Sequence, residues 1–234
     1  MPATPSSARA ILAARWSPRI VLPRLPGLVL GLVLFGAGIA LMAAAGLGLG
    51  PWEVLHQGIS RHTGIALGTV GILVGIPILL LWIPLREVPG SGTVLNVVLI
   101  GTATNLVLPL LPHPADLVLQ ASMMVAGVVV IGLGSGLYLG AGLGPGPRDG
   151  LMTGLHHRFG WSIRRGRTAI ELAVLVAGFL LGGTVGLGTI VFALGIGPLV
   201  QVFLRILGRG DRTALARTDP DLAEELEAPG TVGE

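Results

Sequence analysis

Long apolar runs, separated by short polar or glycine- and proline-rich breaks, dominate the chain. An apolar run of about 18 residues or more can span ~30 Å of hydrocarbon. The pattern predicts six membrane helices, at residues 27–46, 66–85, 92–111, 117–140, 168–185 and 187–207. The expected fold class is therefore all-α and polytopic. Pro77 and Pro84 predict a kink or an early end in the second span.

Composition supports a membrane protein. Hydrophobic residues make up 52% of the chain, charged residues only 12%, and the mean hydropathy is +0.82. A soluble fold of this size needs a polar shell that such a chain lacks. The basic N-terminus, first apolar run and "LMAAAG" also fit a signal peptide. We favour an uncleaved first span, because a run of about 20 residues is long for a signal peptide.

The arginines predict the orientation of the spans. All 15 basic residues are arginines, which together with the Ala, Gly and Pro content suggests a high-GC bacterial genome. They gather in the N-terminal tail, in the loop before the fifth span and after the sixth span, Arg86 lies in the turn between the second and third spans, and Arg61 lies apart from them. Cytoplasmic loops carry the excess of basic residues. We therefore expect a multi-pass protein of the bacterial inner membrane with both termini in the cytoplasm.

One polar break occurs twice. The stretch "AGLGLGPWEVLHQGISRHTG" at 45–64 returns as "AGLGPGPRDGLMTGLHHRFG" at 141–160, 96 residues later and without a gap. In the same register, "GSGT" at 90–93 matches "GLGT" at 186–189. Scattered glycine matches arise by chance in such a chain, but two motifs in one register favour a duplication. Each copy holds three spans, so the second copy must be inverted, which predicts a 3+3 inverted repeat.

This interpretation divides the chain into five parts. Residues 1–26 form a basic cytoplasmic tail and 27–111 the first membrane repeat. Residues 112–126 form an external turn with the start of the fourth span, and 127–207 the second repeat. The tail at 208–234 is expected in the cytoplasm, where too few apolar residues are present to bury a core.

Each repeated break predicts an irregular glycine segment followed by a short helix. Glu53 and Asp149 fall in the first turns, where an acid suits the helix dipole. Two placements fit the pattern: an amphipathic helix flat in the interface with Trp52 in lipid, or a re-entrant helix whose N-terminus faces a cavity. The prolines suit the first helical position. The shared glycines and prolines are Gly48, Gly50, Pro51, Gly144, Gly146 and Pro147.

Interrupted apolar segments at matching places in two inverted halves indicate the binding site of a transporter. The candidate substrate-binding residues are Trp52, Glu53, His56, Gln57, Asn96, Asn105, Arg148, Asp149 and Glu171. Structural alternatives remain for each of them. The Gly-Pro pairs can simply make turns that the acids cap, and polar residues commonly hold membrane helices together. Glu171 can form an i,i+4 pair with Arg167.

We expect no enzyme, metal site, cofactor or nucleic-acid partner. The chain has no cysteine, and it carries no H-E-x-x-H or G-x-S-x-G motif. The expected partners are the lipid bilayer and an unknown small molecule or ion, and a homodimer is a weaker expectation. Because no ATP-binding motif occurs, active transport would depend on an ion gradient.

The repeated motifs also carry a family resemblance. "GLGPWEVLHQGIS" and "GLGPGPRDGLMTGL", with "GGTVGLGT" and "ALGIGP", resemble the YczE/YitT-type bacterial integral membrane proteins over roughly 27–207. Glu53 stands where the resemblance leads us to expect Asp, which keeps the acid. The resemblance implies a bacterial inner-membrane protein and brings no substrate. Two functions stay open: a small secondary transporter or exporter-like protein, and a non-transporting scaffold for another membrane or biosynthetic system.

Overall fold

The computed structural model describes residues 16–207, and within them the chain is helical and contains no strand. The first half comprises α2 (Pro18–Ala45), α3 (Pro51–Thr63), α4 (Leu67–Leu85), α5 (Ser91–Val107) and a 3₁₀ turn, η1 (Leu108–Leu110). The second half comprises α6 (Leu117–Gly140), α7 (Pro147–Phe159), α8 (Ile163–Leu180) and α9 (Leu187–Leu207). The predicted tail at 208–234 and residues 1–15 of the predicted basic tail lie outside the described residues.

Five helical segments are long and apolar enough to cross a membrane: α2, α4, α5 with η1, α6 and α9. The chain is therefore a multi-pass membrane protein. α8 has 18 residues, yet it is not among the five. Its first turns carry Arg164, Arg165, Arg167 and Glu171, which lower its hydropathy.

Local capping signals explain where helix bounds differ from the sequence prediction. α2 begins at Pro18 rather than at 27, because Pro18 occupies the first helical position after an extended Ser17. Part of the predicted tail at 1–26 is therefore helical. α8 begins before 168, since the Ser162 hydroxyl accepts the N–H of Arg165 at 3.3 Å. α4 continues through Pro77 to its end at Leu85.

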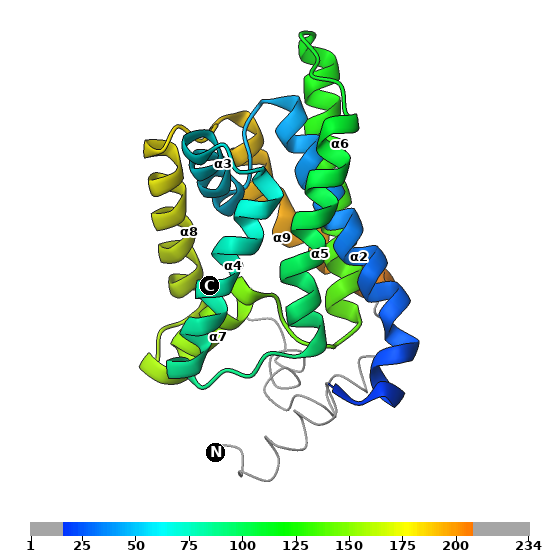
Figure 1. Cartoon of the computed structure of the whole chain (residues 1–234), viewed down its shortest axis with the longest axis vertical. Helices are drawn as coiled ribbons and strands as arrows, with labels where there is room; N and C mark the ends of the chain where they lie inside the picture. Colours follow the sequence, from blue (N-terminus) through cyan, green and yellow to red (C-terminus); the bar gives the residue numbers. More distant parts are fainter. Residues whose placement is uncertain (1–15, 208–234) are drawn as a thin grey trace, which may run out of the picture.

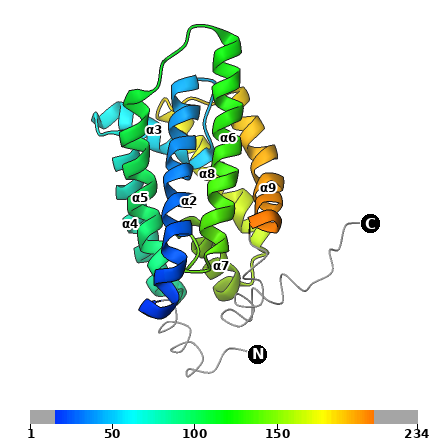
Figure 2. The same cartoon turned by 90° about the vertical axis from the view of Figure 1, so that its right-hand side faces the viewer.

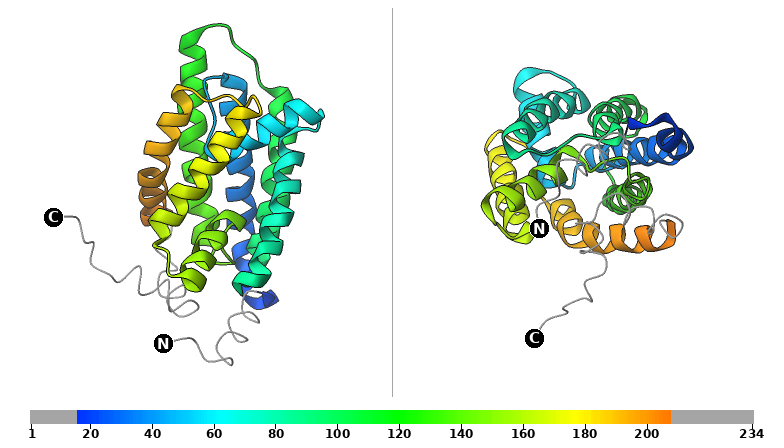
Figure 3. Two further views of the ribbon diagram at one scale, coloured as in Figure 1. Left: turned by 90° about the vertical axis from the view of Figure 1, so that its left-hand side faces the viewer. Right: turned by 90° about the horizontal axis from the view of Figure 1, so that it is seen from below.

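The helices pack in two layers (Figure 1). In one layer α5, α2, α6 and α9 lie side by side in that order, as Figure 2 shows. The other layer contains α3, α4, α7 and α8, which the view from below in Figure 3 separates from the first. Within it α3 packs on α8 and α7 packs on α4, so each short helix contacts a helix of the opposite half. α3 lies in the upper part of Figure 1 and α7 in the lower part.

The two halves share helix bounds and backbone contacts at a spacing of 96 residues. α7, α8 and α9 begin 96 residues after α3, α4 and α5, respectively. The N–H of Gly92 donates to the Leu143 carbonyl at 2.9 Å, and the N–H of Gly188 donates to the Leu47 carbonyl at 2.8 Å. The second bond joins the counterparts of the two residues in the first. The loop before each short helix is thus tied to the start of the last helix of the other half.

Candidate functional site

The first turns of α3 and α7 meet inside the bundle. Arg148 Nη2 on α7 lies 2.8 Å from Glu53 Oε1 on α3. The Arg148 guanidinium also stacks over the Trp52 ring, 4.9 Å from its centroid. Trp52 is only 6% exposed. Of the two placements that the sequence left open, the structure therefore agrees with helices that begin inside the bundle, and Trp52 does not face outward.

The glycine segments lead the chain from the end of each long helix to these buried starts. Gly48 has a φ of 116° and Gly144 a φ of 122°, which side chains disfavour. A Cβ on Gly48 would also lie 2.8 Å from the Thr189 hydroxyl oxygen, and one on Gly144 would lie 2.7 Å from that of Thr93. Both conformation and space therefore require glycine here. Pro51 and Pro147 then occupy the first helical positions, as predicted.

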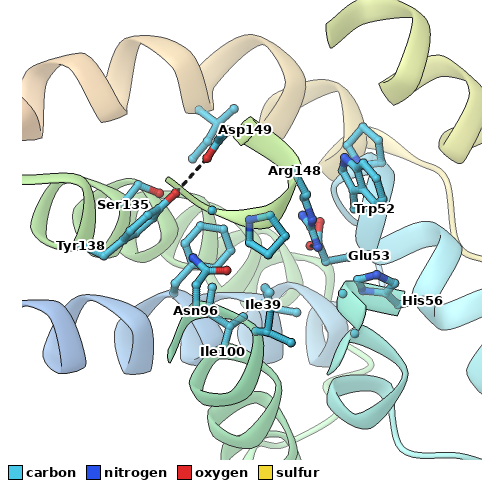
Figure 4. Close-up of a pocket in the computed structure, with 18 of the residues that line it drawn as sticks. Ile39, Trp52, Glu53, His56, Asn96, Ile100, Ser135, Tyr138, Arg148 and Asp149 are labelled. Carbon is cyan, nitrogen blue, oxygen red and sulfur yellow. Dashed lines mark hydrogen bonds and ion pairs between the residues drawn. The ribbon is translucent and has the colours of Figure 1, made fainter. Parts of the chain in front are cut away.

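A pocket of about 360 Å³ lies where the two helices begin (Figure 4), and every helix from α2 to α9 contributes to it. Its volume falls within the range of about 300–1,000 Å³ that is typical of small-molecule sites. Much of its wall is apolar, with aromatic and branched side chains from α2, α5 and α9: Phe35, Ile39, Ile100, Phe192 and Ile196. The pocket can therefore hold a small molecule with an apolar body.

The wall also contains polar side chains, among them three acids and two arginines. The second arginine, Arg167, lies with its Nε 2.9 Å from Glu171 Oε1 in an i,i+4 pair. The Tyr138 hydroxyl donates to Asp149 Oδ2 at 3.2 Å, which Figure 4 shows as a dashed line. Within residues 16–207 no group of three or more His, Asp or Glu side chains could hold a metal ion.

The pocket brings together seven of the nine predicted substrate-binding residues: Trp52, Glu53, His56, Asn96, Arg148, Asp149 and Glu171. The other two do not border it. Gln57 Oε1 accepts the N–H of Thr184 at 2.7 Å, which ties α3 to the α8–α9 turn. Asn105 Oδ1 accepts the N–H of Gly68 at 2.8 Å and so joins α5 to the start of α4.

Three further residues matter to the site that the sequence analysis did not single out as site residues. Tyr138 is the one tyrosine of the chain and lies in an apolar helix, a signal that could have found it. Trp82 donates its indole N–H to the Pro147 carbonyl at 3.0 Å and so holds the start of α7. Arg167, the predicted i,i+4 partner of Glu171, also borders the pocket.

Comparison with known proteins finds one family model and several bacterial relatives that are similar to this chain. The family of unknown function DUF6198 matches residues 22–205. An uncharacterized protein of Haemophilus influenzae is 41% identical over 182 residues, 78% of this chain and 84% of that protein. The uncharacterized membrane protein YczE of Bacillus subtilis is 35% identical over 179 residues, 74% of this chain and 82% of its own. No solved structure matches the chain. The predicted resemblance to YczE-type proteins is confirmed.

Proposed function

This chain belongs to the family of unknown function DUF6198, and we propose that it is a small secondary transporter or exporter-like protein. Two inverted repeats of three spans form it, with α8 as the sixth span, and the pocket holds the substrate. The observation that carries the proposal is the position of this pocket. It lies where two short helices at matching places in the two halves begin, which is where transporters with inverted repeats bind substrate.

Packing between α2 and α6 supports the inverted repeat. A Cβ on Gly31 would lie 2.7 Å from the Gly134 carbonyl oxygen, and one on Gly38 would lie 2.7 Å from that of Gly127. Moving each residue of the first pair by 96 positions into the other half produces the second pair. A two-fold axis between the halves exchanges contacts in this way. An axis in the membrane plane also places α3 and α7 near opposite faces of the membrane.

The length and the charges of α8 are compatible with a span. At 1.5 Å per residue its 18 residues cover about 27 Å, close to the ~30 Å of hydrocarbon. Arg167 and Glu171 pair with each other and border the pocket, and such pairing lowers the cost of placing these charges in a span. The arginines of the α7–α8 region then lie on the cytoplasmic side with both termini, and the membrane is the bacterial inner membrane.

Alternating access of the pocket tests the proposal. Because the chain has no cysteine, each single-cysteine variant carries one thiol. His56→Cys on α3 and Met152→Cys on α7 are counterparts 96 residues apart, and both positions border the pocket. A membrane-impermeant maleimide is added to right-side-out or inverted membrane vesicles. Each pocket thiol should react from both sides, because a transporter opens its site to each side in turn.

Matched controls come from the ends of the same two helices. Thr63→Cys should react only from outside and Phe159→Cys only from the cytoplasm, since both positions are exposed at the C-terminal ends of α3 and α7. Val185→Cys, in the α8–α9 turn, should react from outside if α8 crosses the membrane. Fixed one-sided labelling of both pocket thiols would contradict transport and leave the non-transporting scaffold as the function.

A further inference from the structure

The charges that border the pocket are not balanced. Arg148 is paired with Glu53, and Arg167 is paired with Glu171. The remaining acid, Asp149, has no ion-pair partner within residues 16–207, although both arginines attract it from a longer distance. Two arginines therefore face three acids. Asp149 is only partly exposed, and a nearby positive charge stabilises a partly buried carboxylate, so the pocket favours an additional positive charge beside Asp149.

The repeat explains where the missing charge would come from. Arg148 of the second half reaches the acid of the first half, Glu53. In a two-fold arrangement the reciprocal contact would join Asp149 to the counterpart of Arg148, which is Trp52. Trp52 is uncharged, and Asp149 instead accepts a hydrogen bond from the Tyr138 hydroxyl. The first half thus lacks the cation that the second half supplies.

Buried polar side chains around the pocket independently indicate a ligand. The Trp52 indole N–H is buried and has no hydrogen-bond partner among the described residues. His56 and Asn96 are 5% and 9% exposed and border the pocket, and their side chains make no hydrogen bond to any residue within 16–207. Buried polar groups are nearly always hydrogen-bonded.

We propose that the pocket binds a small organic cation whose ammonium group lies against Asp149 and Tyr138. Its apolar body rests on the apolar wall of the pocket. Tyr138 and Phe35 both border the pocket and pack edge to face with ring centroids 6.3 Å apart, so they form part of its aromatic wall. This substrate class rests on the proposed transport function, but binding can be measured without transport.

Three compounds that share one phenol body and differ in charge test this preference on the purified full-length protein. Tyramine is a cation at pH 7, tyrosol is neutral, and 3-(4-hydroxyphenyl)propanoate is an anion. Binding is measured by isothermal titration calorimetry and by the shift in melting temperature. Tyramine should bind at least about tenfold more tightly than the other two, because one unscreened charge pair supplies that much. An equal response to all three, including none, or a preference for the anion would overturn the proposal.

Two pairs of variants assign the preference to these residues. Asp149→Asn should remove the advantage of tyramine, whereas Asp116→Asn, the same change at the N-cap of α6, should keep it. Trp52→Arg places a built-in cation where the repeat lacks one, so the variant should no longer prefer tyramine. Trp52→Phe, which adds no charge, should keep the preference. A preference that survives Asp149→Asn would refute the assignment even if Trp52→Arg fails to fold.

Failure of this inference differs from failure of the proposed function. Binding of tyramine together with one-sided cysteine labelling would refute transport and keep the ligand class. Two-sided labelling without any charge preference would refute the ligand class and keep transport. The two experiments therefore test separate statements about the same pocket.

Discussion

Loss of Arg148 should destabilise the fold more than loss of Glu53, although both changes remove the same ion pair. The Glu53 side chain is 5% exposed, whereas that of Arg148 is 29% exposed. In Arg148→Gln the carboxylate stays buried without a cation, which costs about 3–5 kcal/mol in free energy of unfolding. In Glu53→Gln the guanidinium keeps its contact with Trp52 and some access to water, so the cost should be about 1–3 kcal/mol.

A double-mutant cycle measures the pair itself. The free energy of unfolding of the wild type, both single variants and the double variant is obtained by denaturant titration in detergent, with tryptophan fluorescence as the signal. The double variant should be more stable than Arg148→Gln alone, because no unpaired charge remains. The coupling free energy should reach at least about 1.5 kcal/mol, as for other close charge pairs with little access to water.

The pair between Arg167 and Glu171 is the matched control. It has a similar separation, 2.9 Å, but its side chains are 50% and 30% exposed. An exposed i,i+4 pair couples by about 0.3–0.5 kcal/mol. If the Glu53–Arg148 cycle gives a value as small as this control, the ion pair between the two short helices does not stabilise the fold, and the reasoning from burial is refuted.

Two further changes test packing and hydrogen bonding through the same unfolding free energies. Gly150→Ala places a methyl group against the ring of Trp82 and should lower the free energy of unfolding by about 1–3 kcal/mol. As a control, Gly166→Ala, whose methyl group meets no atom within 4 Å, should raise the free energy of unfolding by up to about 1 kcal/mol. Equal effects of the two changes would contradict the α4–α7 contact. Thr93→Val removes a buried hydroxyl that donates to the Pro145 carbonyl at 2.8 Å and should lower the free energy of unfolding by about 1–3 kcal/mol. As a control, Thr102→Val on the exposed face of the same helix should change it by less than about 0.5 kcal/mol. A neutral Thr93 variant would show that this bond between the halves does not stabilise the fold.

The short helices could be predicted because their signals are local. A proline at the first helical position and an acid in the first turn favour a helix start whatever surrounds them. The structure begins α3 at Pro51 and α7 at Pro147, as the repeated motif predicts. The glycine before each proline, Gly50 or Gly146, has the extended conformation of an N-cap in both copies.

Contacts between the halves could not be predicted from the same signals, because the long helices are apolar on almost every face. Their hydrophobic periodicity does not indicate which side turns inward. The periodicity of α6 therefore does not predict that Tyr138 faces the pocket, although its hydroxyl donates a hydrogen bond to Asp149 in the structure. The bounds of α8 were misplaced for a related reason. A hydropathy window follows the apolar stretch, whereas the helix begins at the polar cap formed by Ser162.

The residues that the two halves share and those that differ have separate physical causes. Gly48 and Gly144 are alike because both have a positive φ and a close neighbour, which few residues tolerate. Side chains that face the pocket are under no such restriction. If position 52 held an arginine like Arg148, the proposed two-fold arrangement would place a cation beside each of the two acids, Glu53 and Asp149, and the protein alone would balance the charge of Asp149. Because that position is Trp52, Asp149 has no ion-pair partner within residues 16–207, and under our proposal a bound cation supplies one.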